Sequence, residues 1–384
     1  MTASDKGLFI SCGEISGDSR AASLITALRE RGYSGDVTGM LGERSVAAGG
    51  RRDWDSRALH LMGVGDVVPA IPRLIRLKNE MTEAVLGRNP AVVAVIDSPD
   101  FHLPFIAALR KRNWKGKIVY AIPPSVWAWR SGRTKALARD TDLCLPLFRF
   151  EHEFLLKRGV RSEWRGHPMV DEFLGYSAPA GEDLPGDGER RIALLPGSRR
   201  SEITRLLKPL KDCAALLRKC GFAPVFSIAP GLPGDLRDFM MRELRGEDVF
   251  DGEGRDLMAN CIAVAGASGT ASVEAMMLGR FMAVLYKGGF LSWAAWKTMI
   301  RTPFISIPNI LAGKEIYPEF IQGRATGKNV FAALSAFLQD LSFRRSTEEG
   351  IARARSLMGT AGALGFWAET LFELLRSPQG EIYP

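Results

Sequence analysis

Residues 263–279 read AVAGASGTASVEAMMLG and carry the clearest indication of a fold class in the chain. A short apolar run stops at Gly266, a turn of small residues follows, and a helical pattern then begins. The backbone N–H groups and the dipole at the start of such a helix favour a negatively charged ligand. A similar turn, SCGEISGD at residues 11–18, follows the first strand-like run. The sequence therefore carries a strand–turn–helix unit in each half.

The first half alternates expected strands with helical patterns. Leu8–Cys12 is the first expected strand, and continuous apolar runs follow at residues 91–97 and 117–122. Strands that are apolar along their whole length and alternate with helices predict a parallel sheet covered on both faces.

The pattern restarts in the second half. Residues 177–190 are rich in glycine, proline and acidic residues, have no periodicity, and indicate a linker. The stretches RRIALLPGSRR, PVFSIAP and CIAVAGASG then repeat the strand-and-turn pattern. We therefore expect two doubly wound α/β domains, residues 1–176 and 190–345, facing each other across a cleft. Ligands of such domains bind at the carboxyl ends of the strands.

The composition narrows the range of partners and compartments. The 384-residue chain has a formal charge of +8, which favours phosphate-bearing ligands or an anionic membrane surface. Nucleic acid is not expected, because no basic stripe interleaved with aromatic residues is present. The five cysteines form no close pairs, no apolar run is long enough to span a membrane, and the N-terminus has no signal-peptide pattern. These features predict a protein of the reducing cytosol.

Metal ligands are not indicated by the sequence. The four histidines are scattered, and we expect His102 and His167 to be structural. Residues 140–142 read DTD and resemble the metal-binding DxD motif of some enzymes, but they follow a basic helical pattern instead of a buried strand. We interpret them as a solvated strand start, and we expect no metal and no cofactor.

Two turns in the second half have the features of a nucleotide site. Residues 268–270, Ser268, Gly269 and Thr270, open a helix without the GxxxxGK[ST] motif, which predicts phosphate binding without ATP cleavage. Glu274 lies on the same helix face as Thr270, where its carboxylate can accept hydrogen bonds from ribose hydroxyls. Arg199 stands where another helix begins, which is unfavourable for a cation unless an anion such as a diphosphate binds there. The alternatives are an ordinary capped helix with a solvated glutamate, and a surface arginine.

A candidate general base lies in the first half. The stretch AVVAVIDSPDFHLP at residues 91–104 places Asp97 at the end of an apolar strand, with Asp100 close behind. A carboxylate at the ligand-binding edge of a sheet is suited to accept a proton. Physical reasoning from the sequence does not separate Asp97 from Asp100, and Asp97 could instead cap the following helix.

Residues 59–81 form an amphipathic segment. Its prolines at 69 and 72 predict two short helices instead of one. An apolar face bordered by cations is typical of a helix that lies on a membrane surface, although a core-facing helix would show the same stripe. The candidate membrane contacts are Val67, Val68, Ile71, Leu74 and Ile75, beside Arg73, Arg76 and Lys78.

Several stretches together resemble one family, the lipid-A-disaccharide synthases. They run in order along nearly the whole chain, and PSVWAW and SIPNILAG are the most specific of them. The matching stretches are SCGEISGD (11–18), LMGVGDVV (61–68), VIDSPDF (95–101), PPSVWAWR (123–130), RGHPM (165–169), LLPGSR (194–199), ASGTASVEAM (267–276) and SIPNILAG (306–313).

The resemblance implies a metal-independent, inverting glycosyltransferase of the GT-B type. Such an enzyme moves 2,3-diacylglucosamine from UDP-2,3-diacylglucosamine to 2,3-diacylglucosamine 1-phosphate, and forms the β-1,6-linked disaccharide 1-phosphate and UDP. It works at the cytoplasmic face of the inner membrane of Gram-negative bacteria. By analogy with this fold, we expect the C-terminal helical segment, residues 350–384, to join the first domain.

The resemblance also implies roles for the candidate residues. Asp97 would deprotonate the acceptor 6-hydroxyl, Arg199 would hold the diphosphate beside residues 268–270, Glu274 would bind the ribose, and Asn309 would line the nucleotide side. Residues on the side of the donor sugar and acceptor would be Gly13, Glu14, Ser16, Gly17, Asp18 and Asp100.

Other functions are compatible with the residues themselves. They are a different UDP-amino-sugar transferase, a UDP-sugar 2-epimerase, and a nucleotide-sugar-binding protein without turnover. The sequence fixes neither acyl-chain length nor oligomeric state, and it is compatible with a homodimer.

Overall fold

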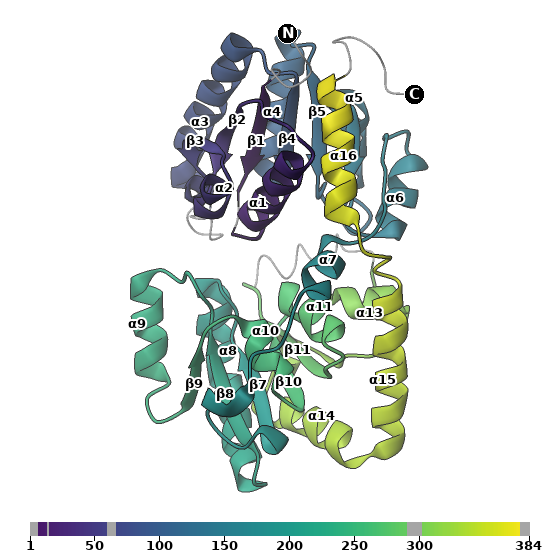
Figure 1. Cartoon of the computed structure of the whole chain (residues 1–384). Coiled ribbons are helices and arrows are strands. Elements are labelled where there is room, and N and C mark those ends of the chain that lie inside the picture. The colour runs from purple at the N-terminus through teal and green to yellow at the C-terminus, as the bar shows by residue number, and fades with distance from the viewer. Residues whose placement is uncertain (1–6, 14, 60–66, 290–301, 377–384) are drawn as a thin grey trace. The chain divides into compact units, whose positions relative to one another are not determined.

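The computed structural model describes residues 7–13, 15–59, 67–289 and 302–376 (Figure 1). The chain divides into two compact units. The first unit comprises Met1–Leu174 together with Met358–Pro384, and the second comprises Gly175–Leu357.

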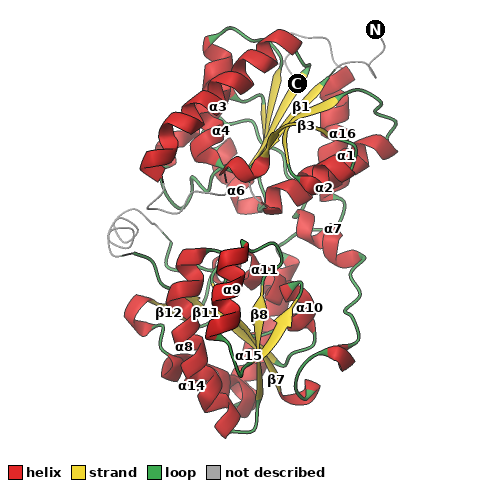
Figure 2. Ribbon diagram, turned by 90° about the vertical axis from the view of Figure 1, so that its left-hand side faces the viewer, coloured by secondary structure: helices red, strands yellow, loops and turns green. Residues whose placement is uncertain are grey.

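The first unit is built on a six-stranded parallel sheet with the strand order β3-β2-β1-β4-β5-β6. Helices cover both faces of this sheet (Figure 2). The strands are β1 (Leu8–Cys12), β2 (Val37–Leu41), β3 (Arg51–Asp55), β4 (Val92–Ile96), β5 (Lys117–Ala121) and β6 (Leu143–Leu145). The helices are α1 (Ile15–Glu30), α2 (Glu43–Ala47), α3 (Val67–Arg88), α4 (Pro99–Lys111), α5 (Thr134–Asp140), α6 (Arg149–Leu156), α7 (Pro168–Leu174) and α16 (Ala363–Arg376).

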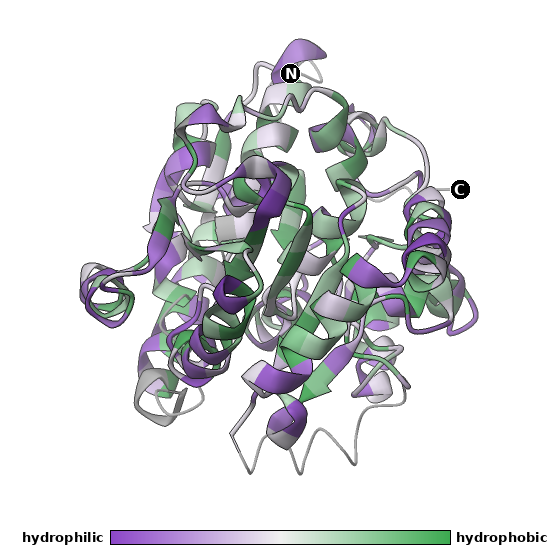
Figure 3. Ribbon diagram, turned by 90° about the horizontal axis from the view of Figure 1, so that it is seen from below, coloured by the Kyte–Doolittle hydropathy of each residue, from purple (hydrophilic) through white to green (hydrophobic). Residues whose placement is uncertain are grey.

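Side chains that alternate along the strands of the first unit pack into two hydrophobic cores, one on each face of the sheet. Leu8, Ile10 and Cys12 of β1 belong to the core beneath α1 and α16, whereas Phe9 belongs to the core beneath α3 and α4. Successive side chains of a strand point to opposite faces, so a strand buried on both faces must be apolar throughout. The apolar strands are visible as green ribbon in Figure 3.

The last helix of the chain is part of the first unit. Helix α16 lies beside α1 (Figure 1), and Trp367 of α16 is 1% exposed within the core that contains Leu24 and Ile96. The first unit is therefore completed only when the C-terminal segment has been added to it.

The second unit repeats the architecture of the first. Its parallel sheet has the order β12-β11-β10-β7-β8-β9, in which the first strand in the chain, β7, again lies next to the fourth, β10. The strands are β7 (Arg191–Leu195), β8 (Ala223–Ile228), β9 (Asp248–Asp251), β10 (Ala263–Ala267), β11 (Met282–Tyr286) and β12 (Glu319–Ile321). The helices are α8 (Arg200–Lys219), α9 (Gly234–Glu243), α10 (Gly254–Ala259), α11 (Thr270–Met277), α13 (Ile307–Ala312), α14 (Gly327–Gln339) and α15 (Leu341–Ser356).

Both sheets confirm the prediction of doubly wound α/β domains. In each sheet the strand order reverses between the first and the fourth strand, β1 and β4 or β7 and β10. The carboxyl ends of the strands at such a reversal, the topological switch point, form the usual ligand-binding crevice of this fold.

One buried arginine holds part of residues 177–190, the stretch that was expected to be a linker. The guanidinium of Arg191, which is 2% exposed, donates hydrogen bonds to the carbonyls of Leu184 (3.0 Å), Pro185 (2.8 Å) and Gly186 (2.6 Å). Residues 184–186 are therefore held against the second unit, because a buried guanidinium requires acceptors for its N–H groups.

The expectation of two short helices in residues 59–81 was wrong. Helix α3 is continuous from Val67 to Arg88 and contains Pro72. Pro69 is the third residue of α3, where a backbone N–H would have no intrahelical partner. The missing N–H of this proline therefore removes no helical hydrogen bond. Pro72 removes only one hydrogen bond near the start of the helix, and the turns that follow continue unbroken.

Replacing Trp367 by alanine is expected to destabilise the first unit by about 3–5 kcal/mol, because a large buried side chain leaves a cavity. Hydrogen exchange followed by mass spectrometry should show faster exchange in β1 and α1, with little change in β7 and β10. Glu369→Ala is the control, since Glu369 is exposed on the same helix. Equal protection of β1 in both variants would contradict the assignment of α16 to this core.

Candidate active site

The loops after β1 and β4 meet closely at the switch point of the first unit. A Cβ atom built on Gly13 would lie only 2.1 Å from Ser98 Oγ and 2.7 Å from Leu59 Cδ1. Only glycine allows the two loops to approach this closely. Gly13 therefore sets the position of the loop that carries Asp97.

Asp97 lies in a sharp turn at the end of β4. Asp97 and Ser98 both have left-handed backbone conformations, with φ values of 56° and 46°, which non-glycine residues rarely adopt. The turn is stabilised by two side chains, because the carbonyl of Asp97 accepts hydrogen bonds from Tyr120 Oη (2.9 Å) and His102 Nδ1 (2.6 Å). Strained backbone that is held in this way is frequent at functional sites.

His102 has the structural role that was expected. Its ring is fully buried, and burial lowers the pKa of His102 to about 4. The neutral ring must donate from Nδ1, since the Asp97 carbonyl can only accept. The Nε2 atom therefore accepts from Ser11 Oγ, at 2.8 Å. His102 thus links β1 to the turn that carries Asp97.

The two candidate bases have different surroundings. Asp97 is half-buried, whereas the Asp100 side chain is 64% exposed. The Oδ1 atom of Asp100 accepts hydrogen bonds from both Arg130 (3.1 Å) and Arg133. The guanidinium groups of these arginines also lie over the ring of Trp129, 4.5 and 5.7 Å from its centre. Asp100 is therefore engaged in ion pairs with two arginines of the loop after β5.

The residues after β1 form the start of α1, and Asp18 has a structural role there. Its carboxylate accepts hydrogen bonds from the backbone N–H groups of Gly42 (2.9 Å), Arg44 (3.0 Å) and Ser45 (3.1 Å). Asp18 is 6% exposed and caps α2, so its carboxylate is not available to a sugar.

The other candidates in this turn differ in accessibility. Gly17 is buried, Ser16 is half-buried, and Glu14 lies outside the described residues. The turn shapes the edge of the site mainly through its backbone.

In the second unit, the loop after β7 carries Arg199 to the switch point. Gly197 has a φ of 108°, and a Cβ atom built on it would lie 2.5 Å from Glu202 Oε2. The Glu202 carboxylate accepts from the backbone N–H groups of Ser198 (3.3 Å) and Arg199 (3.4 Å), and it lies 3.5 Å from Arg199 Nη1. Glu202 therefore supplies the negative charge that a helix start with an arginine requires. The Arg199 side chain remains 65% exposed.

The loop after β10 forms the neighbouring helix start. Helix α11 begins at Thr270, and Gly269 precedes it with a φ of 151°. Gly269 and Thr270 are exposed, while Ser268 and Glu274 are half-buried. The first N–H groups of a helix have no intrahelical partners and attract anions. Because β7 and β10 are adjacent, Arg199 and the start of α11 lie at the same sheet edge.

Asn309 differs from the expectation that its side chain lines a nucleotide pocket. It is fully buried, and its amide Nδ2 donates to Tyr317 O (2.7 Å) and Glu319 Oε1 (2.8 Å). Its Oδ1 accepts from the N–H groups of Ile316 and Tyr317, both at 2.8 Å. The amide has no hydrogen-bonding capacity left for a nucleotide. Asn309 therefore holds the segment between α13 and β12 in place.

A buried carboxylate that the sequence did not single out joins two loops at the edge of the first sheet. Glu151 accepts hydrogen bonds from Trp127 Nε1 (2.7 Å) and from the N–H groups of Leu147 and Phe148 (3.2 Å each). Burial raises the pKa of Glu151 to about 7, although these donors act to lower it. The PSVWAW motif drew attention to Trp127 in the sequence. Its hydrogen-bond partner Glu151 lies 24 residues further along the chain, in no motif that was singled out.

The DTD stretch is not a solvated strand start. Asp140 is 1% exposed at the end of α5 and accepts hydrogen bonds from Arg139 at 2.6 and 2.7 Å. Asp142 accepts from Ile118 N at 2.8 Å. These aspartates secure the end of the first sheet. Across the described part of the chain, no group of three or more histidines, cysteines, aspartates and glutamates is arranged to hold a metal.

Among the described residues, no helix combines the length and the apolar character that crossing a bilayer requires.

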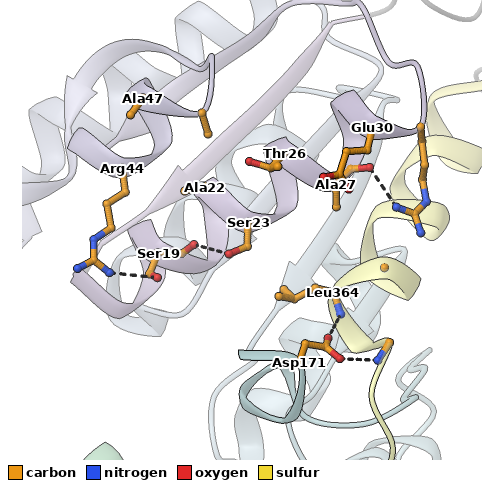
Figure 4. Close-up of a pocket in the computed structure, with 14 residues that line it drawn as sticks. Ser19, Ala22, Ser23, Thr26, Ala27, Glu30, Arg44, Ala47, Asp171 and Leu364 are labelled. Carbon is orange, nitrogen blue, oxygen red and sulfur yellow. Dashed lines mark hydrogen bonds between the residues drawn. The ribbon is translucent and has the colours of Figure 1, made fainter. Parts of the chain in front are cut away.

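A groove of about 780 Å³ on the first unit lies away from these residues (Figure 4). It is bordered by α1, α2 and the start of α16, and hydroxyl groups of Ser19, Ser23 and Thr26 face it together with Arg44. Asp171 caps α16 at its rim through the N–H groups of Gly362 and Leu364. Its lining contains none of the described candidate residues, so the switch points remain the candidate site.

Comparison with known proteins identifies relatives along the whole chain. A family model described as lipid-A-disaccharide synthetase matches residues 8–359. The lipid-A-disaccharide synthase of Myxococcus xanthus is 31% identical over 393 residues, covering 98% of both chains. That of Pseudomonas aeruginosa is 33% identical over 371 residues, covering 94% of this chain and 96% of the relative.

Solved structures share the fold at much lower identity. The UDP-GlcNAc 2-epimerase of Neisseria meningitidis bound to UDP-GlcNAc has a TM-score of 0.65 at 14% identity, covering 96% of this chain and all of the other. A calicheamicin glycosyltransferase has a TM-score of 0.58 at 12% identity, covering 99% and 100%. These matches confirm the GT-B fold class.

The raised pKa of Glu151 predicts a pH-dependent contribution to stability. Folding raises this pKa from 4.5 to about 7, so the contribution is full below about pH 4.5 and is lost as the pH rises through 7. Glu151→Gln does not titrate, so its stability relative to wild type should improve between pH 4.5 and 7 and then level off. Urea midpoints across this range measure the difference. Because buried histidines titrate equally in both proteins, a constant difference would contradict the prediction.

Proposed function

Since the chain belongs to the lipid-A-disaccharide synthase family, which consists of glycosyltransferases of lipid A biosynthesis, we propose how its residues divide the reaction. The donor is UDP-2,3-diacylglucosamine and the acceptor is 2,3-diacylglucosamine 1-phosphate. The acceptor 6-hydroxyl attacks the anomeric carbon, UDP departs, and a β-1,6-linked disaccharide 1-phosphate forms. The observation that carries the proposal is the family match over residues 8–359, which includes both switch points.

Asp97 is the general base in this proposal. It follows β4 at the switch point, and its backbone is fixed by Tyr120 and His102. The choice of Asp97 over Asp100 rests on the family, whose VIDSPDF stretch this chain carries at residues 95–101. A positioned base of this kind typically contributes roughly 10²- to 10⁴-fold to the rate.

The second unit binds UDP and stabilises it as a leaving group. Arg199 offers bidentate donors to the diphosphate, and the start of α11, at residues 268–270, offers backbone N–H groups and a favourable dipole. Glu274 lies one helical turn after Thr270 and binds the ribose hydroxyls. Donors that are fixed in advance stabilise the developing negative charge without a metal ion.

A UDP-sugar 2-epimerase is the alternative with the same fold. The epimerase structures are 13–15% identical to this chain, and such a likeness supports the fold alone. The two activities differ in their need for an acceptor, since an epimerase converts the UDP-sugar by itself.

Acceptor-dependent release of UDP from UDP-2,3-diacylglucosamine tests the proposal. Wild-type protein should release UDP only with 2,3-diacylglucosamine 1-phosphate present, and EDTA should have no effect. Asp97→Asn should reduce turnover by roughly 10²- to 10⁴-fold because it removes the proton acceptor. Its affinity for UDP, measured by calorimetry, should be unchanged.

Asp36→Asn serves as the control, because Asp36 is an exposed carboxylate that precedes β2 at the amino edge of the same sheet. Near-normal turnover by Asp97→Asn would refute the base assignment. Conversion of the UDP-sugar without acceptor would instead favour the epimerase.

Helix α3 is proposed to contact the cytoplasmic face of the inner membrane, where acylated substrates reside. Ile71 and Ile75 are 43% and 51% exposed, and Arg73 and Arg76 beside them are exposed as well. Exposed isoleucines bordered by cations suit an anionic lipid surface. Leu74 differs from the expectation, because it packs against the core beneath α3 and α4. The side chains of residues 67–70 lie outside the described part of the structure.

The double variant Ile71→Ser/Ile75→Ser should bind anionic vesicles at least about tenfold more weakly, because two exposed apolar side chains are lost. Co-sedimentation with phosphatidylglycerol-containing vesicles measures the binding. Leu156→Ser is the matched control, since Leu156 of α6 is 50% exposed. Undiminished vesicle binding by a folded double variant would exclude this face of α3 as the contact.

A further inference from the structure

Two arginines in the loop after β5 form a cationic cluster that the reaction described so far does not use. This cation pair, Arg130 and Arg133, follows the PSVWAW motif at the carboxyl edge of the first sheet. Arg130 has a left-handed backbone with a φ of 48°, so the loop turns sharply at this point. Trp129, which is 36% exposed, contacts both guanidinium groups and orders them.

Arg133 lacks a full set of hydrogen-bond partners. Its side chain is only 18% exposed, and within the described residues its Nη1 atom is buried without a hydrogen-bond partner. Its Nη2 atom donates to Asp100. A buried donor without a partner is energetically unfavourable, and a ligand that supplies an acceptor removes this cost.

The local charge balance favours an anion. The cation pair carries two positive charges, and Asp100 supplies one negative charge, through the single oxygen Oδ1. An exposed ion pair of this kind is weak, so it does not prevent either guanidinium from binding a second anion. Arginine binds phosphate with two parallel hydrogen bonds, which gives it both strength and directionality.

The cation pair lies close to the proposed base. The hydroxyl of Tyr120 donates to the carbonyl of Asp97. Asp97 directly precedes Ser98, the N-cap of α4, and Asp100 lies in the first turn of that helix, where it pairs with both Arg130 and Arg133. One helical turn therefore connects the proposed base to the cation pair.

We propose that Arg130 and Arg133 bind the phosphate on C1 of the acceptor sugar, and that Asp100 positions the two guanidinium groups. This inference rests on the proposed function. In the acceptor, the phosphate-bearing C1 and the C5 that carries the 6-hydroxymethyl group flank the ring oxygen, so a 6-hydroxyl at Asp97 keeps the phosphate within the width of one sugar. The loops after the adjacent strands β4 and β5 carry Asp97 and the cation pair. The diphosphate of the donor is held by Arg199 and α11 in the second unit, so the cation pair selects the acceptor.

The test compares two acceptors, 2,3-diacylglucosamine with and without its 1-phosphate. Wild-type enzyme should have a lower KM for the phosphorylated acceptor. Arg130→Ala and Arg133→Ala should each raise this KM roughly 10- to 100-fold, because a charged hydrogen-bonded contact to phosphate is lost. The KM for the acceptor without phosphate and the KM for UDP-2,3-diacylglucosamine should be unchanged.

Arg112→Ala is the matched control. Arg112 is 55% exposed and pairs with Glu83 at 2.8 Å, at the opposite end of α4 from Asp100. It should leave both acceptor KM values unchanged. If Arg133→Ala does not fold, Arg130→Ala tests the proposal by itself. Arg130 is 44% exposed in a loop, so its replacement should not disturb the fold.

Two outcomes would overturn the inference. The first is a variant that retains the wild-type preference for the phosphorylated acceptor, and the second is an equal rise in KM for both acceptors, which would indicate a structural role only. Failure of the proposed function is distinguishable, because the wild type would then release no UDP with either acceptor.

Discussion

Close approach of neighbouring loops at the switch point of each unit is the constraint on which the positions of the candidate residues depend. In the first unit, Gly13 allows the loop after β1 to contact Ser98, beside Asp97. In the second unit, Gly197 allows the loop after β7 to approach Ala267, whose Cβ would lie 3.3 Å from a Cβ built on Gly197. A side chain at either glycine would push adjacent loops apart. Because these loops carry the candidate residues Asp97 and Arg199, the position of each within its own unit depends on the absence of a glycine side chain.

Many polar residues near the site hold the backbone in place and do not face a ligand. Asp18 caps α2, His102 supports the turn at Asp97, and Asn309 fixes the segment before β12. All three are buried and hydrogen-bonded to backbone groups. A buried polar group that already has its partners gains nothing from a ligand, whereas breaking its bonds is costly. Residues that remain accessible to a ligand, such as Arg199 and Thr270, are therefore the better candidates for binding one.

The sequence was a good guide to the fold because β1, β4 and β10 are apolar on both faces, a local pattern that only a covered parallel sheet explains. It was a poorer guide to the site. A motif shows which residues lie near a turn, but not which way their side chains point, so Asp18 and Asn309 could not be recognised as structural. The pair of Trp127 and Glu151 was missed because its members lie in different loops. The continuity of α3 was not predicted, because proline is tolerated only near the start of a helix and the sequence did not show that α3 begins at Val67.

In the proposed reaction each unit presents a cation to a substrate phosphate, and in each unit a carboxylate already pairs with that cation. Arg199 lies 3.5 Å from Glu202, and Arg130 lies 3.1 Å from Asp100. A guanidinium has five N–H donors, more than one carboxylate uses, so the carboxylate orients the group without saturating it. Exposed pairs of this kind contribute about 0–1 kcal/mol, which a dianionic phosphate can exceed. The counter-charge also limits how tightly phosphate binds, and this matters because UDP and a phosphorylated disaccharide must both leave after each turnover. The net charge of +8 favours attraction of anionic substrates over distance, and under the proposed division of roles the paired carboxylates keep both binding steps reversible.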